Sequence, residues 1–179
     1  MRRRSISVAV ALALASSAIG CGDASKAASA NLPKLPTPLV EGFSSHQPTA
    51  EVEDALRRAG KRITVVEDGA PRTAPSKARP PLSVRVVRVS PFELWGIEGD
   101  LRLEFLDGAL SSTWFFPSDP KKFDAEAKKR SLGAEPSQPL RLQPATELRS
   151  DVDYTGARYW AWEDINLRQK LEQWIKRNA

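Results

Sequence analysis

The stretch Leu101–Phe116, LRLEFLDGALSSTWFF, has the strongest local pattern in this sequence. Asp107-Gly108 lies between runs of alternating apolar residues, and glycine readily takes the positive φ that a type I′ turn needs. We therefore predict a β-hairpin that turns at these two residues. An uninterrupted count then gives the pairs Leu106 with Ala109, Phe105 with Leu110, Leu103 with Ser112 and Leu101 with Trp114.

This register assigns the side chains of the hairpin to two faces, because successive residues of a strand point to opposite sides. The face predicted to be buried carries Leu101, Leu103, Phe105, Leu110, Trp114 and Phe116. The second face is mixed, and its apolar members are Leu106, Ala109 and Phe115. We expect the domain to assemble on the first face, and another element or a partner to cover the apolar part of the second.

The N-terminus has the organisation of a secretory signal. Three arginines follow Met1, an apolar run rich in Ala, Val and Leu extends from Ile6 to Ile19, and small residues surround Gly20-Cys21. A positive start, a short apolar segment and a small-residue exit are typical of a cleaved signal peptide. The run is too short and too rich in alanine for a membrane-spanning helix. We predict that residues 1–20 are a signal peptide.

Cys21 is the single cysteine of the chain and lies where the signal would be cut. The segment Ala18-Ile19-Gly20-Cys21 resembles the lipobox of bacterial lipoproteins, with Ala18 in place of the usual leucine. The resemblance implies that Cys21 is acylated, palmitate included, and becomes the new N-terminus. Acyl chains of this kind anchor a protein stably in a membrane. The alternative is an ordinary signal cleaved near Ala18, which would leave a free thiol.

Residues 21–39 are rich in Ala, Ser, Pro and Lys and are predicted to form the acylated cysteine and a flexible tether. Gly22 follows the cysteine where inner-membrane lipoproteins carry aspartate, so the resemblance implies an outer-membrane protein facing the periplasm. Loss of the three signal arginines lowers the formal net charge of +5 by three, to +2. The basic isoelectric point is therefore weak support for a nucleic-acid partner, and we expect none.

Residues 40–179 are predicted to form a single α+β domain, with an antiparallel sheet built on the central hairpin and two or three helices packed on one face. The pattern predicts a helix over Thr49–Gly60 with Thr49 as N-cap, and a second helix after Ser118 with Asp119 as N-cap. Predicted strands cover 63–66, 82–89, a short segment within 92–98, the hairpin 101–116, 140–142 and 158–163. Asp164 is predicted to cap a C-terminal helix, and 70–81 is predicted to be an exposed basic loop.

Residues with catalytic chemistry do not form a recognisable constellation. The single histidine, His46, lies among polar residues before the first helix, and no Gly-x-Ser-x-Gly motif accompanies it. Asp151-x-Asp153 lacks the further ligands of a calcium loop and indicates a polar turn. Nothing selects a catalytic pair from the candidate carboxylates Glu98, Glu104, Asp107 and Asp119. We therefore expect a protein that is not an enzyme and has no cofactor or metal, with a carboxylate-based hydrolase as the least favoured alternative.

The five tryptophans are the remaining candidates for a binding site. Trp114 and Trp174 fall on apolar stripes and are predicted to be buried. Trp160 and Trp162 share one face of a strand, and Trp95 lies outside any clear pattern and is expected to be the most exposed. Trp95, Trp160 and Trp162 are therefore the speculative ligand-binding residues, with burial in the core as the commoner role for such side chains.

The order of elements, together with the motif Phe105-x-Asp107-Gly108-x-Leu110, resembles small outer-membrane lipoproteins of the SmpA/OmlA type. That resemblance implies a non-catalytic envelope domain that binds other proteins, and it transfers no functional residue. We expect a lipid-anchored interaction or accessory module of the cell envelope with an envelope protein as partner. The alternative is a module that binds peptidoglycan, lipid or a small molecule through exposed aromatic side chains.

Overall fold

The computed structural model describes residues 36–69, 82–134, 138–143 and 145–178. The predicted signal peptide, Cys21, most of the predicted tether and the predicted basic loop at 70–81 lie outside these residues. The described part contains the helices α1 (Thr49–Arg58), α2 (Pro120–Lys129) and α3 (Ile165–Asn178). Its strands are β1 (Ile63–Gly69), β2 (Val84–Leu94), β3 (Ile97–Leu106), β4 (Ala109–Pro117), β5 (Leu140–Arg141), β6 (Thr146–Val152) and β7 (Arg158–Asp164).

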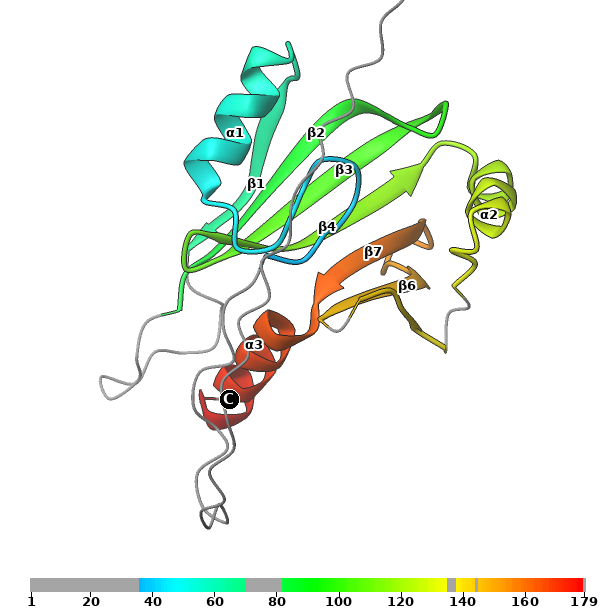
Figure 1. Ribbon diagram of the computed structural model, residues 1–179. Helices are drawn as coiled ribbons and strands as arrows, with labels where there is room; N and C mark the ends of the chain where they lie inside the picture. The colour runs from blue at the N-terminus through cyan, green and yellow to red at the C-terminus, as the bar shows by residue number, and fades with distance from the viewer. Residues whose placement is uncertain (1–35, 70–81, 135–137, 144, 179) are drawn as a thin grey trace, which may run out of the picture. The chain divides into compact units, whose positions relative to one another are not determined.

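All seven strands form one antiparallel sheet in the order β1-β2-β3-β4-β7-β6-β5 (Figure 1). The fold is therefore α+β, as predicted. Two of its connections are two-residue turns, Trp95-Gly96 between β2 and β3 and Asp107-Gly108 between β3 and β4, and all four residues have positive φ. Such φ values characterise type I′ hairpin turns. The first of these turns was not predicted, because tryptophan is not a turn signal.

The register of β3 and β4 follows the prediction only next to the turn. Leu106 lies opposite Ala109 and Phe105 opposite Leu110, but the register shifts at Glu104, which lies opposite Ser112. Ser111 is the extra residue of a β-bulge. From there on the predicted pairs are wrong by one residue: Leu103 pairs with Thr113, and Leu101 pairs with Phe115.

The bulge exchanges the two faces for the second half of β4. Phe115 is fully buried in the main apolar cluster, whereas Trp114 and Phe116 belong to a separate cluster with Tyr159 and Ala161. The predicted burial of Trp114 on the first face is therefore wrong: its side chain is half-buried on the other side of the sheet. A one-residue shift has this effect because strand side chains alternate with period two.

We call the two sides of the sheet the core face and the mixed face. The core face carries the largest apolar cluster, whose sheet members include Val87, Val89, Leu101, Leu103, Phe105, Leu110, Phe115, Leu148, Trp160 and Trp162. The segment before α1 adds Leu39 and Val40, α1 adds Val52 and Leu56, and α2 adds Phe123. Val84, Val86 and Leu106 point to the mixed face, where they pack with Leu167 and Leu171 of α3. Two helices thus contribute to one face and the third to the other.

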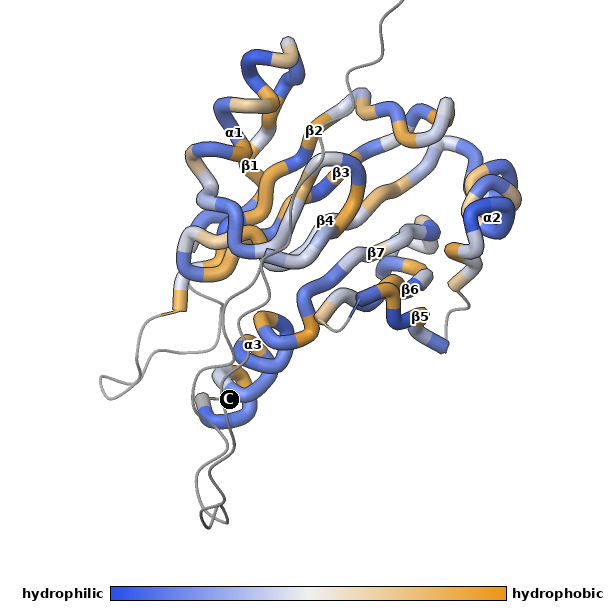
Figure 2. The backbone as a smooth tube through the Cα atoms, in the orientation of Figure 1, coloured by the Kyte–Doolittle hydropathy of each residue, from blue (hydrophilic) through white to orange (hydrophobic). Residues whose placement is uncertain are grey.

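The helix ends follow local chemistry. Asp119 caps α2 by accepting from the Lys122 backbone N–H at 2.9 Å, and Pro120 follows it, as predicted. Thr49 is not the N-cap of α1. Pro48 occupies that position, and the Thr49 hydroxyl instead donates to the carbonyl oxygen of Gly108 in the hairpin turn. Figure 2 shows α2 as largely hydrophilic, which fits a helix whose buried side chains are Phe123 and Ala127.

Strand β6 was not predicted. Its sequence, TELRSDV, contains a single large apolar residue that is buried, Leu148, and the neighbouring inward positions are the buried hydroxyl residues Thr146 and Ser150. The polar alternation therefore gives no hydrophobic signal. Its pairing with all seven residues of β7 extends the sheet beyond the predicted strands.

Candidate functional site

The candidate site lies on the mixed face, at the bulge of β4. Because Ser111 and Ser112 both lie beside Glu104, their hydroxyls approach one carboxylate oxygen, Oε1, at 3.3 and 3.5 Å. The Ser111 hydroxyl also lies 2.9 Å from the backbone oxygen of Glu104. Trp114 Nε1 donates to the Ser112 hydroxyl at 2.9 Å. The bulge thus joins a carboxyl group, two hydroxyls and an indole in one hydrogen-bonded group.

The Glu104 carboxyl has a perturbed protonation equilibrium. Burial raises its pKa, and the negative charges of Glu163 and Glu67 raise it further. Hydrogen bonds with Ser111 and Ser112 lower it again without cancelling the increase. Among the described residues, no lysine or arginine forms an ion pair with Glu104. A carboxyl group in such surroundings favours the neutral form more than an exposed glutamate does.

Glu104 lines a pocket of about 190 Å³. The pocket is formed by four neighbouring strands, with Val66, Glu67, Val86, Arg102, Glu104 and Trp114 as its lining residues. Two of these side chains are held in place by aromatic neighbours. Trp114 stacks on Tyr159 with ring centroids 5.3 Å apart, and the Arg102 guanidinium lies 4.1 Å from the centroid of Phe116. The pocket therefore combines apolar walls with a poorly compensated carboxyl group.

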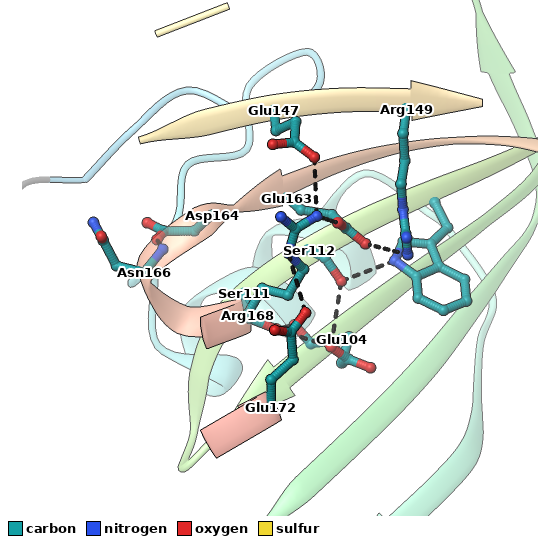
Figure 3. A network of polar contacts seen from close by, with 11 residues as sticks. Glu104, Ser111, Ser112, Glu147, Arg149, Glu163, Asp164, Asn166, Arg168 and Glu172 are labelled. Atoms are coloured by element: carbon teal, nitrogen blue, oxygen red, sulfur yellow. Dashed lines mark hydrogen bonds and ion pairs between the residues drawn. The ribbon is translucent and has the colours of Figure 1, made fainter. Parts of the chain in front are cut away.

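A charged network adjoins this site (Figure 3). The buried carboxylate of Glu163 accepts from Arg149 at 2.9 Å and from Arg168 at 3.0 Å, and Arg168 also donates to Glu147 at 3.0 Å. Burial disfavours the charge of Arg168, but Glu147 and Glu163 outweigh it and raise the pKa of the guanidinium. Because Arg168 belongs to α3, these contacts fasten that helix to β6 and β7.

The start of α3 is fixed by a second acidic group. Asp164 is buried, and its Oδ1 accepts from the backbone N–H groups of Asn166 and Leu167 at 2.9 and 3.1 Å. It is therefore the predicted cap of the C-terminal helix. Its other oxygen, Oδ2, lies 3.5 Å from His46 Nε2. His46 is thus partly covered and contacts a carboxylate instead of lying free on the surface.

The contact of His46 with Asp164 does not extend to a catalytic triad. The adjacent serine, Ser45, is fully buried, and its Oγ accepts from the backbone N–H of Thr37 at 3.0 Å and lies 3.1 Å from the Thr37 hydroxyl. No hydrogen bond joins Ser45 to His46 in the part of the chain that the structure describes. These groups join the segment before α1 to the start of α3.

The structure brings the three tryptophans of the sequence-predicted site together: Trp95 contacts Trp162, and Trp95 and Trp160 both contact Phe123, mostly inside the core. Trp160 is fully buried and Trp162 is 2% exposed, so neither offers a ring face to a ligand. Trp95 is half-buried in its turn, where it stacks on Phe123 at 4.9 Å with the Arg130 guanidinium 4.8 Å from its ring centroid. The tryptophan that lines a pocket is Trp114, which sequence reasoning placed in the core because the bulge has no recognisable pattern.

The other candidate carboxylates have structural roles or lie apart from the pocket. Asp107 accepts from the Ser83 backbone N–H and from Lys170, and Asp119 caps α2. Glu98 is exposed on β3 and is not a pocket residue. Asp153 accepts from the backbone N–H groups of Thr155 and Ala157, so Asp151-x-Asp153 ends in a polar turn, as predicted. Of the four candidates, Glu104 is the one that lines the pocket on the mixed face.

Two further observations concern metals and membranes. Within the described ranges, no group of three or more His, Cys, Asp or Glu side chains is arranged to hold a metal ion. The helices of that same part of the chain include none that is long and apolar enough to cross a membrane.

No protein-family model matches the sequence, and no curated protein matches it significantly.

Proposed function

We propose that this protein is a lipid-anchored protein of the bacterial cell envelope whose α+β domain is a non-catalytic interaction or accessory module. The observation that carries the location is Cys21, placed directly after an arginine-led apolar segment and small residues. Acylation there would tether the domain through the Ala- and Pro-rich segment that follows. The outer membrane, facing the periplasm, is the proposed site because Gly22 follows the cysteine.

The anchor is tested by metabolic labelling of the full chain with an alkyne palmitate in a bacterial host. We expect Cys21 to carry the label in the membrane fraction, Cys21→Ala to abolish labelling, and Ser17→Ala to leave it intact. A mature chain that is cleaved near Ala18 and carries no label would overturn the lipid anchor while leaving export in place.

The interaction role is tested in the same membranes. Chemical crosslinking followed by capture of the tagged full chain should return a reproducible protein of the envelope. Recovery of the free monomer alone, at several crosslinker lengths, would argue against an interaction module.

Ligand binding is the second candidate function, and a specific arrangement favours it. The mixed face holds a pocket lined by Trp114 and the partly buried Glu104, which are linked through the Ser112 hydroxyl. Apolar walls with a few oriented polar groups are typical of sites for small molecules. We expect the indole resonance of Trp114 to respond to a ligand of the envelope. A resonance that remains unchanged across muropeptides, lipids and small metabolites would count against this function.

A further inference from the structure

In the part of the chain that the structure describes, no lysine or arginine pairs with the carboxyl group of Glu104. It accepts hydrogen bonds from two serine hydroxyls, and the two charged side chains that act most strongly on it, Glu163 and Glu67, are both acidic. Glu163 is already compensated by Arg149 and Arg168. Glu67, which lines the same pocket, also forms no ion pair within the described ranges, so the pocket holds two carboxyl groups without a basic partner there.

The nearby arginines do not meet this need. Arg102 lines the pocket, but its guanidinium lies over the ring of Phe116 and is not paired with Glu104. Arg88, on the neighbouring strand, pairs with Asp100. In this arrangement no described residue supplies a cation to Glu104, so the position beside its carboxyl group is open to a cation from a ligand.

The shape of the pocket limits what that group can be. A volume of about 190 Å³ is several times the roughly 30 Å³ that one water occupies in the liquid. It is below the range of roughly 300–1,000 Å³ that is typical of sites for larger ligands. Val66, Val86 and Trp114 supply apolar surface, so a short alkyl chain fits beside the carboxyl group. An aromatic face can also attract a cation.

We propose that this pocket binds a primary alkylammonium group, with the ammonium at Glu104 and the chain against Val66, Val86 and Trp114. The inference rests on the proposed ligand-binding function. The ammonium can come from a free small amine or from the lysine side chain of a peptide, because both present the same chemistry.

Binding has a defined pH dependence. The groups that face Glu104 are Glu67 from β1, Arg102 from β3, Ser111 and Ser112 from β4, and Glu163 from β7. The ammonium requires the ionised carboxylate, so binding lowers the pKa of Glu104 and releases a proton. The affinity should fall by about tenfold for each pH unit below the pKa of Glu104 in the free protein.

The experiment uses the full, lipidated chain in detergent and follows the indole N–H resonance of Trp114, assigned with Trp114→Phe. Titration with n-butylamine should give a saturable shift, whereas n-butanol and butyrate should bind at least about tenfold more weakly. Glu104→Gln should lower the affinity for butylamine by at least about tenfold. Thermal denaturation checks that this variant is folded. Glu126→Gln, on the exposed side of α2, is the matched control and should have no effect.

Further arms distinguish the possible failures. Equal binding of amine and alcohol, unaffected by Glu104→Gln, would overturn the ammonium assignment but retain a ligand pocket. A Trp114 resonance that responds to no probe would overturn both. A short peptide with an acetylated N-terminus and a free lysine side chain is the second probe. Tighter binding of this peptide than of butylamine would identify a protein as the source of the ammonium. Tighter binding of butylamine would identify a free amine.

Discussion

The two faces of the sheet are stabilised by different physics. The core face is an apolar layer in which Phe115, Phe123 and Trp160 are fully buried, and the ring of Phe123 lies 5.0 Å from that of Phe115 and 4.8 Å from that of Trp160. The mixed face has a smaller apolar contact with α3 and a network of carboxylates and arginines. Apolar contacts stabilise in proportion to the area that they remove from water, whereas buried charges need well-placed partners to offset their desolvation.

Because of this difference, residues of the core face stabilise the fold, whereas the mixed face has groups that can bind a ligand. On the core face, the buried polar atoms without a hydrogen-bond partner among the described residues are uncharged, Thr113 Oγ1 and Trp160 Nε1. On the mixed face, Glu163 has two arginine partners, but Glu104 has only hydroxyl groups. An incompletely compensated polar group beside a pocket is a feature of binding sites, because a ligand can supply the missing interaction.

Removing an aromatic anchor from the core face should have the largest effect. Phe123 of α2 is fully buried and contacts Trp95, Phe115 and Trp160. Phe123→Ala should lower the free energy of unfolding by about 3–5 kcal/mol, because it removes buried area and leaves a cavity. Urea denaturation measures this loss. Lys121→Ala, an exposed change on the same helix, is the control, and equal losses in both variants would contradict the role of Phe123 as the anchor of α2.

Removing one charge from the network of the mixed face should have an intermediate effect. Glu163→Gln keeps the shape of the side chain but leaves Arg149 without its acidic partner and Arg168 with Glu147. A fully buried pair would cost about 3–5 kcal/mol to break, and the partial exposure of both arginines reduces the expected loss to about 1–3 kcal/mol. Glu172→Gln, at the exposed end of the same network, should cost less. Chemical denaturation of the two variants tests the order, and a larger loss in Glu172→Gln would refute it.

The smallest of the three effects concerns Glu104 and should depend on pH. Its pKa in the folded state is raised, so the stability that it contributes is fully present below the pKa of the unfolded chain and is lost as pH rises through the folded-state pKa. Glu104→Gln removes this loss. The variant should gain thermal stability relative to the parent protein as pH rises from 4 to 9, as measured by the melting temperature at each pH. A difference that stays constant over this range would show that Glu104 ionises normally in the folded state.

Local sequence signals predicted much of the fold. The Asp107-Gly108 turn, the cap and proline that begin α2, and the Asp164 cap of α3 all depend on residues close together in the chain. Such features are predictable because the same few residues both form the structure and carry its pattern. The apolar alternation of β3 likewise identified Leu101, Leu103 and Phe105 as core residues.

Features that depend on distant partners were missed. Strand β6 has little apolar character of its own, and it lies in the sheet because its backbone pairs with β7. Trp95 occupies a positive-φ turn position, where contacts with Phe123 and Trp162 hold its ring. The pocket joins Glu67 with Trp114, which are 47 positions apart, and no local pattern relates them.

The sequence by itself determined the class of the fold, its clearest turn, two helix caps and the lipobox-like position of Cys21, because each is encoded in neighbouring residues. Only the tertiary structure decided which way the second half of the central hairpin faces. The extra residue at Ser111 reverses the side-chain alternation, so Phe115 enters the core and Trp114 reaches the pocket beside Glu104. The bulge depends on pairing across strands, because the Ser111 hydroxyl donates to the backbone oxygen of Glu104. Two adjacent serines in the sequence do not predict it.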